Sequence, residues 1–346
     1  MADFDVKPSV IDRVRDRPRR LQRLAVLIVI LGMGLALLYP LLRDRHGAPI
    51  EVRDVPRLPP ENLAVIPLAA SPTDDPRRVA LGRRLFFDAR LSPLGRSCGN
   101  CHVPASYGTL RAARSPGLGD QLDEFNVPTV LNAALSPYLG WKGKITSLAD
   151  QLHRVINNPR HMGSNWAWVI ETLSADSDYR SRFSALYADG ITRSSITDAI
   201  LAFERSLVTP GAPFDRYLRG EFGALTSEQI AGYELFKDYG CIACHQGRNL
   251  GGNLIIRFGI LEDPFKDGFF DAATPKSKRF LKLRVPSLRN VAKTGPYLHD
   301  GSVETLEEVV RLMARYQLGR EMPEEDVRRI VAFLHSLTAP LPENFR

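Results

Sequence analysis

Two short stretches decide the fold of this chain: Arg-Ser-Cys-Gly-Asn-Cys-His at 96–102 and Tyr-Gly-Cys-Ile-Ala-Cys-His at 239–245. Both contain C-x-x-C-H, which is typical of covalent haem attachment. Two thiols three residues apart lie on one turn, so each can form a thioether with a haem vinyl group, and the adjacent histidine can bind the iron. The sequence therefore predicts two haem c groups, held by Cys98, Cys101 and His102 and by Cys241, Cys244 and His245.

A disulfide, a redox-active thiol pair and a zinc site are the alternatives for a single C-x-x-C motif. The chain has only four cysteines, and both copies of the motif use all of them. Two copies, no spare cysteine and the export segment described next all favour haem, because haem is attached outside the cytoplasm.

The N-terminus predicts a membrane anchor. A basic tail, 1–23, precedes an apolar run at 24–42, which is about long enough to cross a bilayer as a helix. The excess of arginine before the run places the N-terminus in the cytoplasm and the rest of the chain in the periplasm. A cleaved signal peptide, which would leave a soluble periplasmic protein, is the alternative. No basic block outside the tail suggests binding to nucleic acid.

Weak internal repeats divide the remainder into two parts. The proline-rich segment 43–75 reads as a linker. G-x-x-L-F-x-D then precedes each haem motif, at 82–88 and 232–238, and I-x-A-F-x-x-S-L follows each, at 200–207 and 330–337. The apolar positions of the second repeat predict an amphipathic helix.

Each part thus reads as helix, haem motif, irregular segment and closing helix, an order that resembles the cytochrome c fold. We expect a mainly α protein with two cytochrome c-like haem domains, 76–222 and 223–346, preceded by the N-terminal transmembrane helix.

Four further stretches, 126–132, 208–217, 284–301 and 306–319, occur in order between and after the haem motifs. Together with those motifs they resemble the bacterial di-haem cytochrome c peroxidase family, which includes the MauG-type enzymes. The resemblance implies that the N-terminal haem cleaves peroxide and that the C-terminal haem receives electrons.

The resemblance also implies roles for single residues. Met313 matches the methionine ligand of the C-terminal haem iron, and a thioether ligand raises the haem potential. Trp141 matches a tryptophan between the two haems. A calcium site is implied by Asn126, Thr294 and Pro296, whose oxygen atoms suit a hard cation.

Two departures from the family pattern concern the N-terminal haem. The segment 103–126 contains no histidine or methionine to cap the resting iron, so that haem is expected to be open. His161 stands where the family has a glutamate that acts as acid and base. Histidine can move a proton near neutral pH. An iron ligand and a residue that supports the site indirectly are the other interpretations of His161, and Arg160 beside it is expected to polarise the peroxide bond.

The leading hypothesis is therefore a peroxidase that reduces hydrogen peroxide with electrons from a small periplasmic cytochrome c or cupredoxin. MauG-type proteins carry a tyrosine in place of the methionine ligand, so Met313 favours the peroxidase, although Tyr297 lies nearby in the sequence. MauG-type oxidation of a protein side chain stays open as an alternative, as does a tethered electron carrier without enzymatic activity. The resemblance also favours a homodimer.

Overall fold

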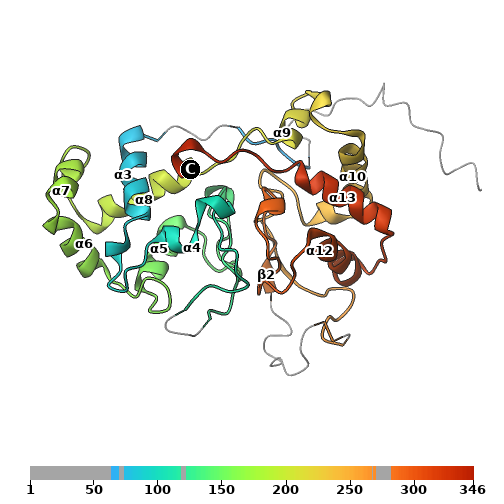
Figure 1. Cartoon of the computed structure of the whole chain (residues 1–346), viewed down its shortest axis with the longest axis horizontal. Coiled ribbons are helices and arrows are strands. Elements are labelled where there is room, and N and C mark those ends of the chain that lie inside the picture. The colour runs from blue at the N-terminus through green and yellow to red at the C-terminus, as the bar shows by residue number, and fades with distance from the viewer. Residues whose placement is uncertain (1–63, 70–73, 118–121, 267, 270–281) are drawn as a thin grey trace, which may run out of the picture. The chain divides into compact units, whose positions relative to one another are not determined.

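The helices that flank each haem motif cross in the same way. The computed structural model describes residues 64–69, 74–117, 122–266, 268–269 and 282–346, all within one compact unit, Pro59–Arg346. In it α3 (Pro76–Phe86) packs on α8 (Arg193–Ser206), and α10 (Ser227–Asp238) packs on α13 (Glu324–His335) (Figure 1). The predicted pairing of opening and closing helices is confirmed.

The glycine of the G-x-x-L-F repeat makes each crossing. A Cβ atom on Gly82 would collide with the carbonyl oxygen of Ala199, and one on Gly232 would collide with that of Arg329. Only glycine permits so close an approach of two helix backbones. The same repeat supplies the aromatic pairs behind the crossings: Phe86 lies 5.2 Å from Phe203, and Phe236 lies 5.2 Å from Phe333, between ring centroids.

A capping box begins the helix before the second haem motif. Thr226 caps α10, where its hydroxyl accepts a hydrogen bond from the backbone N–H of Gln229 and the Gln229 side chain accepts one from Thr226. This reciprocal arrangement fixes the first turn of the helix that leads into the second haem motif.

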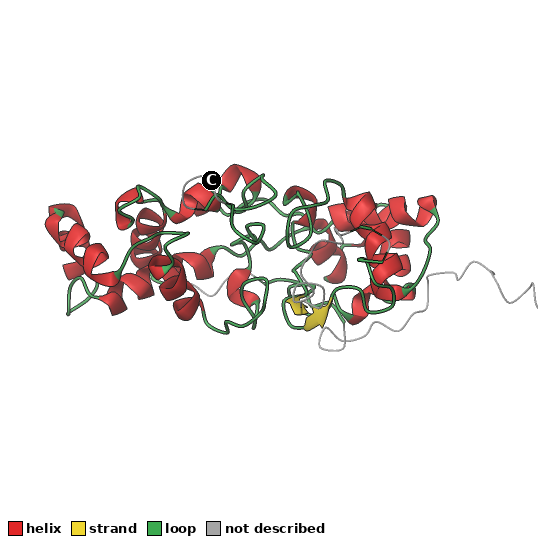
Figure 2. Cartoon of the chain, turned by 90° about the horizontal axis from the view of Figure 1, so that it is seen from below, coloured by secondary structure: helices red, strands yellow, loops and turns green. Residues whose placement is uncertain are grey.

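Helices and loops make up most of the described chain (Figure 2), as expected for a mainly α protein. The remaining α-helices and the two strands of one antiparallel ribbon are α4 (Cys98–Cys101), α5 (Leu148–Asn157), α6 (Trp166–Ala175), α7 (Ser177–Ser184), α9 (Pro213–Leu218), α12 (Leu306–Leu312), β1 (Ile255–Arg257) and β2 (Lys282–Arg284).

Short 3₁₀ turns connect these elements, and one π-helical turn follows α12. The π turn is Met313–Gln317; the 3₁₀ turns are Ala89–Leu91, Pro104–Ser106, Ala133–Leu135, Phe222–Ala224, Cys241–Ala243, Val291–Lys293 and Glu343–Phe345.

A repeat that sequence reading missed becomes visible in the loops. Val-Pro-Thr-Val-Leu-Asn at 127–132 corresponds to Val-Pro-Ser-Leu-Arg-Asn at 285–290. Asn132 and Asn290 both adopt the left-handed conformation, with φ of 59° and 61°. Their backbone N–H groups donate to the carbonyls that end the closing helices, Leu207 and Leu337, at 2.8 and 3.1 Å. Each asparagine therefore ties its loop to the end of a closing helix.

Part of the predicted linker is packed rather than extended. Val65 and Leu68 are buried, and Val65 belongs to the core around Phe333. The predicted tail 1–23 and anchor 24–42 lie outside the described residues. Within the described ranges, no helix combines the length and the apolar character needed to cross a bilayer.

A buried ion pair holds this packed segment. Arg289, 1% exposed, donates from Nη1 to Asp215 Oδ2 at 2.8 Å, and it also donates to the carbonyls of Arg248 and Ile66. The second carboxylate oxygen of Asp215 accepts from the Leu68 N–H at 3.0 Å. Burying two charges is favourable only when their hydrogen bonds are satisfied, as they are here.

Removing one partner of this pair should be costly, because the other charge stays buried. We expect Asp215→Ala to lower the free energy of unfolding by about 3–5 kcal/mol, measured by urea denaturation of the haem-loaded protein. Glu324→Ala is the control, since it breaks the exposed Arg311–Glu324 pair and should cost no more than about 1 kcal/mol. Equal effects of the two substitutions would contradict this account.

Candidate functional site

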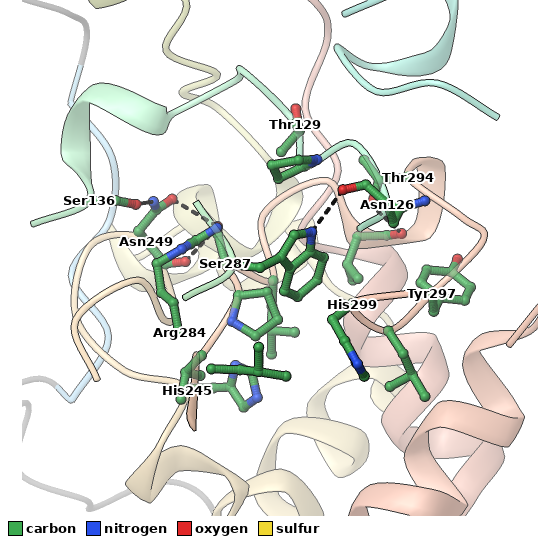
Figure 3. Close-up of a pocket in the computed structure, with 18 of the residues that line it drawn as sticks. Asn126, Thr129, Ser136, His245, Asn249, Arg284, Ser287, Thr294, Tyr297 and His299 are labelled. Carbon is green, nitrogen blue, oxygen red and sulfur yellow. Dashed lines mark hydrogen bonds between the residues drawn. The ribbon is translucent and has the colours of Figure 1, made fainter. Parts of the chain in front are cut away.

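A cavity of about 320 Å³ gathers most of the residues that sequence analysis singled out. His102 and His245, the histidines of the two haem motifs, both line it. So do Trp141, Met313 and the residues expected at the calcium site, Asn126, Thr294 and Pro296. Figure 3 labels Asn126, Thr294 and His245 among the lining residues. The two V-P-x-x-x-N loops supply much of the remaining wall.

Each motif histidine is oriented by a backbone carbonyl. Nδ1 of His102 lies 2.9 Å from the Gly108 oxygen, and Nδ1 of His245 lies 3.2 Å from the Leu250 oxygen. A proton on Nδ1 satisfies these contacts and leaves the Nε2 lone pair free, the arrangement that metal-binding histidines adopt. Burial lowers the pKa of both rings, that of His245 to about 4, so both are neutral at pH 7.

The four cysteines are all unpaired. Burial, and then the neighbouring carboxyl of Glu204, raise the pKa of the Cys98 thiol to about 12. Burial likewise raises the pKa of Cys241 to about 11. A structural zinc site needs four ligands, and the described residues hold no cluster of three or more metal-binding His, Cys, Asp or Glu side chains. The residues present fit a haem at each motif better than a bare metal ion.

Trp141 lies between elements of the two parts. Its indole Nε1 donates to the Asn126 carbonyl at 2.8 Å (Figure 3), and its ring centroid lies 6.4 Å from that of His299. The Trp141 carbonyl in turn accepts the backbone N–H of Arg284 at 2.7 Å. The indole is therefore fixed by contacts on both sides of the cavity.

Met313 begins the π-helical turn after α12, and its side chain lines the same cavity as His245. It is absent from the apolar core beside it, although the neighbouring Val310 belongs to that core. Single π turns inside helices are frequent at functional sites, since they re-aim side chains.

The structure places Arg160 and His161 away from the cavity wall. His161 Nε2 lies 2.7 Å from the Asp123 carboxylate, and Nδ1 lies 3.2 Å from the Asn158 side-chain amide. Arg96 binds the carbonyls of Arg160 and His161 at 2.9 and 3.1 Å. The imidazole is thus held as the donor in a pair with Asp123.

Three cavity residues escaped sequence reasoning: Gln151, Glu204 and Arg284. Oε1 of Gln151 is buried and has no hydrogen-bond partner among the residues that the structure describes. Arg284 is 9% exposed, and its side chain bonds only the Gly140 carbonyl, through Nε, among the described residues. Burial alone lowers its pKa to about 10. Alignment of the internal repeats could have identified Glu204, because the equivalent residue of the other closing helix is Leu334.

An uncompensated buried cation is expensive, so the Arg284 guanidinium calls for an anionic group in the cavity. A haem carries two propionate carboxylates, and such a group would neutralise Arg284. This is a second observation that favours haem in the cavity.

Comparison with known proteins identifies similar chains. Residues 76–222 match the family model described as di-haem cytochrome c peroxidase. The cytochrome c peroxidase Ccp of Escherichia coli K12 is 41% identical over 80% of this chain, which spans 61% of that relative's length. The cytochrome c551 peroxidase of Nitrosomonas europaea is 37% identical, and the match covers 82% of this chain and 86% of the relative.

MauG-type proteins are also similar, at lower identity. The methylamine utilization protein MauG of Methylophilus methylotrophus is 30% identical over 75% of this chain and 82% of its own length. The crystal structure of a MauG-like protein associated with microbial copper homeostasis superposes with a TM-score of 0.66 at 27% identity, covering 83% of this chain and 95% of that one.

The Asp123–His161 pair generates a prediction about acid stability. Although burial opposes it, the hydrogen bond from His161 lowers the pKa of Asp123 below its ordinary value of 3.8. The pair therefore stabilises the fold above that value, and this contribution is lost as the pH falls through the lowered pKa. In Asp123→Asn the free energy of unfolding should fall less steeply than in the unmodified protein as the pH drops below about 4. Urea denaturation at a series of pH values measures this.

His161→Ala should have the same effect, because it removes the donor. The double variant should then resemble either single one, since both act on one interaction. Additive effects in the double variant would mean that the two residues stabilise the fold separately.

Proposed function

The chain belongs to the di-haem cytochrome c peroxidase family, and we propose that it reduces hydrogen peroxide to water: H2O2 + 2 e⁻ + 2 H⁺ → 2 H2O. The observation that carries the proposal is the single cavity that brings together both motif histidines, Met313 and Trp141. Relatives named cytochrome c peroxidase, at 37–41% identity, are more similar to this chain than the MauG relative at 30%.

Haem c is the cofactor of this family, and the residues that would hold it are in place. The first haem is attached through Cys98 and Cys101 with His102 on its iron, in a domain that spans 76–222. The second is attached through Cys241 and Cys244 in a domain that spans 223–346. Bound haem supplies the iron chemistry that accepts electrons and cleaves the O–O bond.

His245 and Met313 would bind the iron of the second haem. Arg284 neutralises a propionate in the cavity, and its backbone N–H holds the Trp141 carbonyl at 2.7 Å. This fixes Trp141 in the region between the haems, where its ring couples electron transfer from the second haem to the first.

The side chains that handle protons stand beside the first haem. His161, held by Asp123, serves as acid and base, and Arg160 supports it with positive charge. His161 does not line the cavity. A water molecule or another side chain therefore carries the proton between His161 and the cavity. Gln151, whose buried Oε1 lacks a partner, is suitably placed on the cavity wall.

A calcium ion is proposed at Asn126, Thr294 and Pro296. The Asn126 side-chain nitrogen donates to the Ala112 carbonyl at 3.0 Å, so the Oδ1 oxygen of the same amide points away from Ala112. One side-chain oxygen, backbone carbonyls and water form a suitable set for calcium.

The electron donor is a small periplasmic cytochrome c or cupredoxin. The protein works in the periplasm, either anchored in the inner membrane by 24–42 or released after cleavage, and it forms a homodimer. Tyr297 lines the cavity together with Met313, and this favours MauG-type oxidation of a protein side chain as the second candidate function.

The resting spin state and turnover test the proposal together. An open first haem should give a high-spin ferric signal, and the His245–Met313 haem should be low-spin. The purified protein should then oxidise a reduced cytochrome c when peroxide is added. The loss of the absorption band of the reduced donor measures this oxidation. Two low-spin six-coordinate haems without turnover would indicate an electron carrier. Peroxide-dependent oxidation of a protein side chain, with no oxidation of donor, would indicate the MauG-type function.

The proposed role of His161 predicts a defined loss of rate. His161→Ala should slow peroxide cleavage by about 10²–10⁴-fold, the usual contribution of a positioned acid–base group, as measured by stopped-flow mixing with peroxide. His153→Ala is the matched control, because His153 stacks on Trp166 outside the cavity and should leave the rate nearly unchanged. An unaltered rate in His161→Ala would rule out the acid–base role.

A further inference from the structure

Glu204 is an acidic residue in a place where the other half of the molecule has an apolar one. It lies on α8 within the repeat I-x-A-F-x-x-S-L, and the equivalent residue of α13 is Leu334. Both side chains line the cavity. The neighbouring positions keep their packing in both halves, since Phe203 and Phe333 are fully buried. The difference between Glu204 and Leu334 thus gives the first haem motif an acidic neighbour and the second haem motif an apolar one.

The carboxyl of Glu204 has no hydrogen bond or ion pair with any described residue, and it faces the cavity. It lies close enough to Cys98, the first attachment cysteine, to influence the pKa of that thiol. Burial raises the pKa of Glu204 itself to about 7, against a smaller opposing effect of Arg205. A carboxyl in this position can gain or lose its proton near neutral pH.

The charged groups on the elements packed around α8 do not neutralise Glu204. Its helix neighbour Arg205 is bound to Asp74 by two hydrogen bonds, at 2.8 and 2.9 Å. Cys98 no longer titrates once it is a thioether. Other charged side chains on α3, α5 and α8 have partners of their own. On α3, Arg77 pairs with Asp75, Arg78 with Asp198 and Arg84 with Asp178, and Arg83 donates to the carbonyls of Asn344 and Arg346. On α5 and α8, Arg154 pairs with Asp150, His153 bonds Trp166 and Asn157, and Arg193 lies over the Trp166 ring.

We propose that Glu204 is a redox-linked proton site that lowers the potential of the first haem relative to the second. An oxidised haem carries one more positive charge than a reduced one, so a nearby carboxylate stabilises the oxidised form. In a cavity with little water this interaction is stronger than at the surface. Leu334 exerts no such effect on the second haem.

The coupled step is balanced in charge. When one electron from the small periplasmic donor reaches the first haem by way of the second, the Glu204 carboxylate takes up one proton from solvent. When the haem gives up that electron, the carboxyl releases the proton. This inference requires a haem at Cys98, Cys101 and His102, as proposed above, but it does not require peroxidase activity.

Redox titration of the haem-loaded protein tests the proposal. Midpoint potentials of both haems are measured by spectroelectrochemistry from roughly pH 6 to pH 9, where one coupled proton lowers the potential by up to about 59 mV for each tenfold fall in proton concentration. The first haem of the unmodified protein should show this dependence, centred on the Glu204 titration. The second haem should change less over the same range.

Two substitutions separate charge from packing. Glu204→Gln keeps the shape of the side chain, and Glu204→Leu reproduces the residue of the other half. Both should remove the pH dependence of the first haem and raise its potential at the alkaline end, with two haems per chain retained. Asp198→Asn is the matched control, because Asp198 lies on the same helix, pairs with Arg78 and does not line the cavity.

The proposal is overturned if the first haem potential does not depend on pH in the unmodified protein, or if Glu204→Gln keeps the full dependence. A dependence lost equally in Asp198→Asn would also overturn it, since the effect would then be structural. A protein that shows the expected potentials without turning over peroxide would leave the inference standing and contradict the proposed peroxidase function, so the two can fail separately.

Discussion

One hydroxyl group joins the two halves of the cavity wall. Thr209 Oγ1 accepts the side-chain amides of Asn132 and Asn290, at 2.8 and 2.9 Å, and all three residues are buried. Each asparagine ends a V-P-x-x-x-N loop, and both loops line the cavity. A buried amide without an acceptor destabilises the fold. Separating the two loops would leave at least one asparagine amide without its acceptor, so it is unfavourable. The positions of both motif histidines depend on these loops.

The two halves share one framework, so the positions at which they differ point to functional residues. Helix crossings, aromatic pairs and left-handed asparagines are repeated almost unchanged, as packing requires. The departures fall on cavity residues: an acid at 204 against a leucine at 334, and an uncompensated arginine at 284. The proposed difference in haem potential rests on these unequal charges within near-identical frames.

Much of the frame could be predicted from the sequence, because its determinants are local. The C-x-x-C-H motifs and the helix caps each act within a few residues of themselves, and the helices at 76–86 and 227–238 follow from the local pattern around them. The glycines of G-x-x-L-F were visible because the stretch occurs twice, although the backbones that they contact, at Ala199 and Arg329, are distant in the sequence. The site was predicted less completely. Met313 and Trp141 line the cavity with the motif histidines, whereas His161 and Arg160 do not. Arg284 carries no local signal, since an arginine in a loop is ordinarily solvated.

The sequence by itself determined the two haem motifs, the mainly helical frame and its duplication, since each rests on short-range spacing and periodicity. Only the tertiary structure decided that Asp123 holds His161 and that Glu204 opens onto the cavity. It also decided that Asp215 neutralises Arg289, while no carboxylate among the described residues pairs with Arg284. The physical reason is that the cost of a charge depends on its burial and its partners. Here the partners come from segments 38 and 74 residues apart, and no local pattern encodes which of them meet.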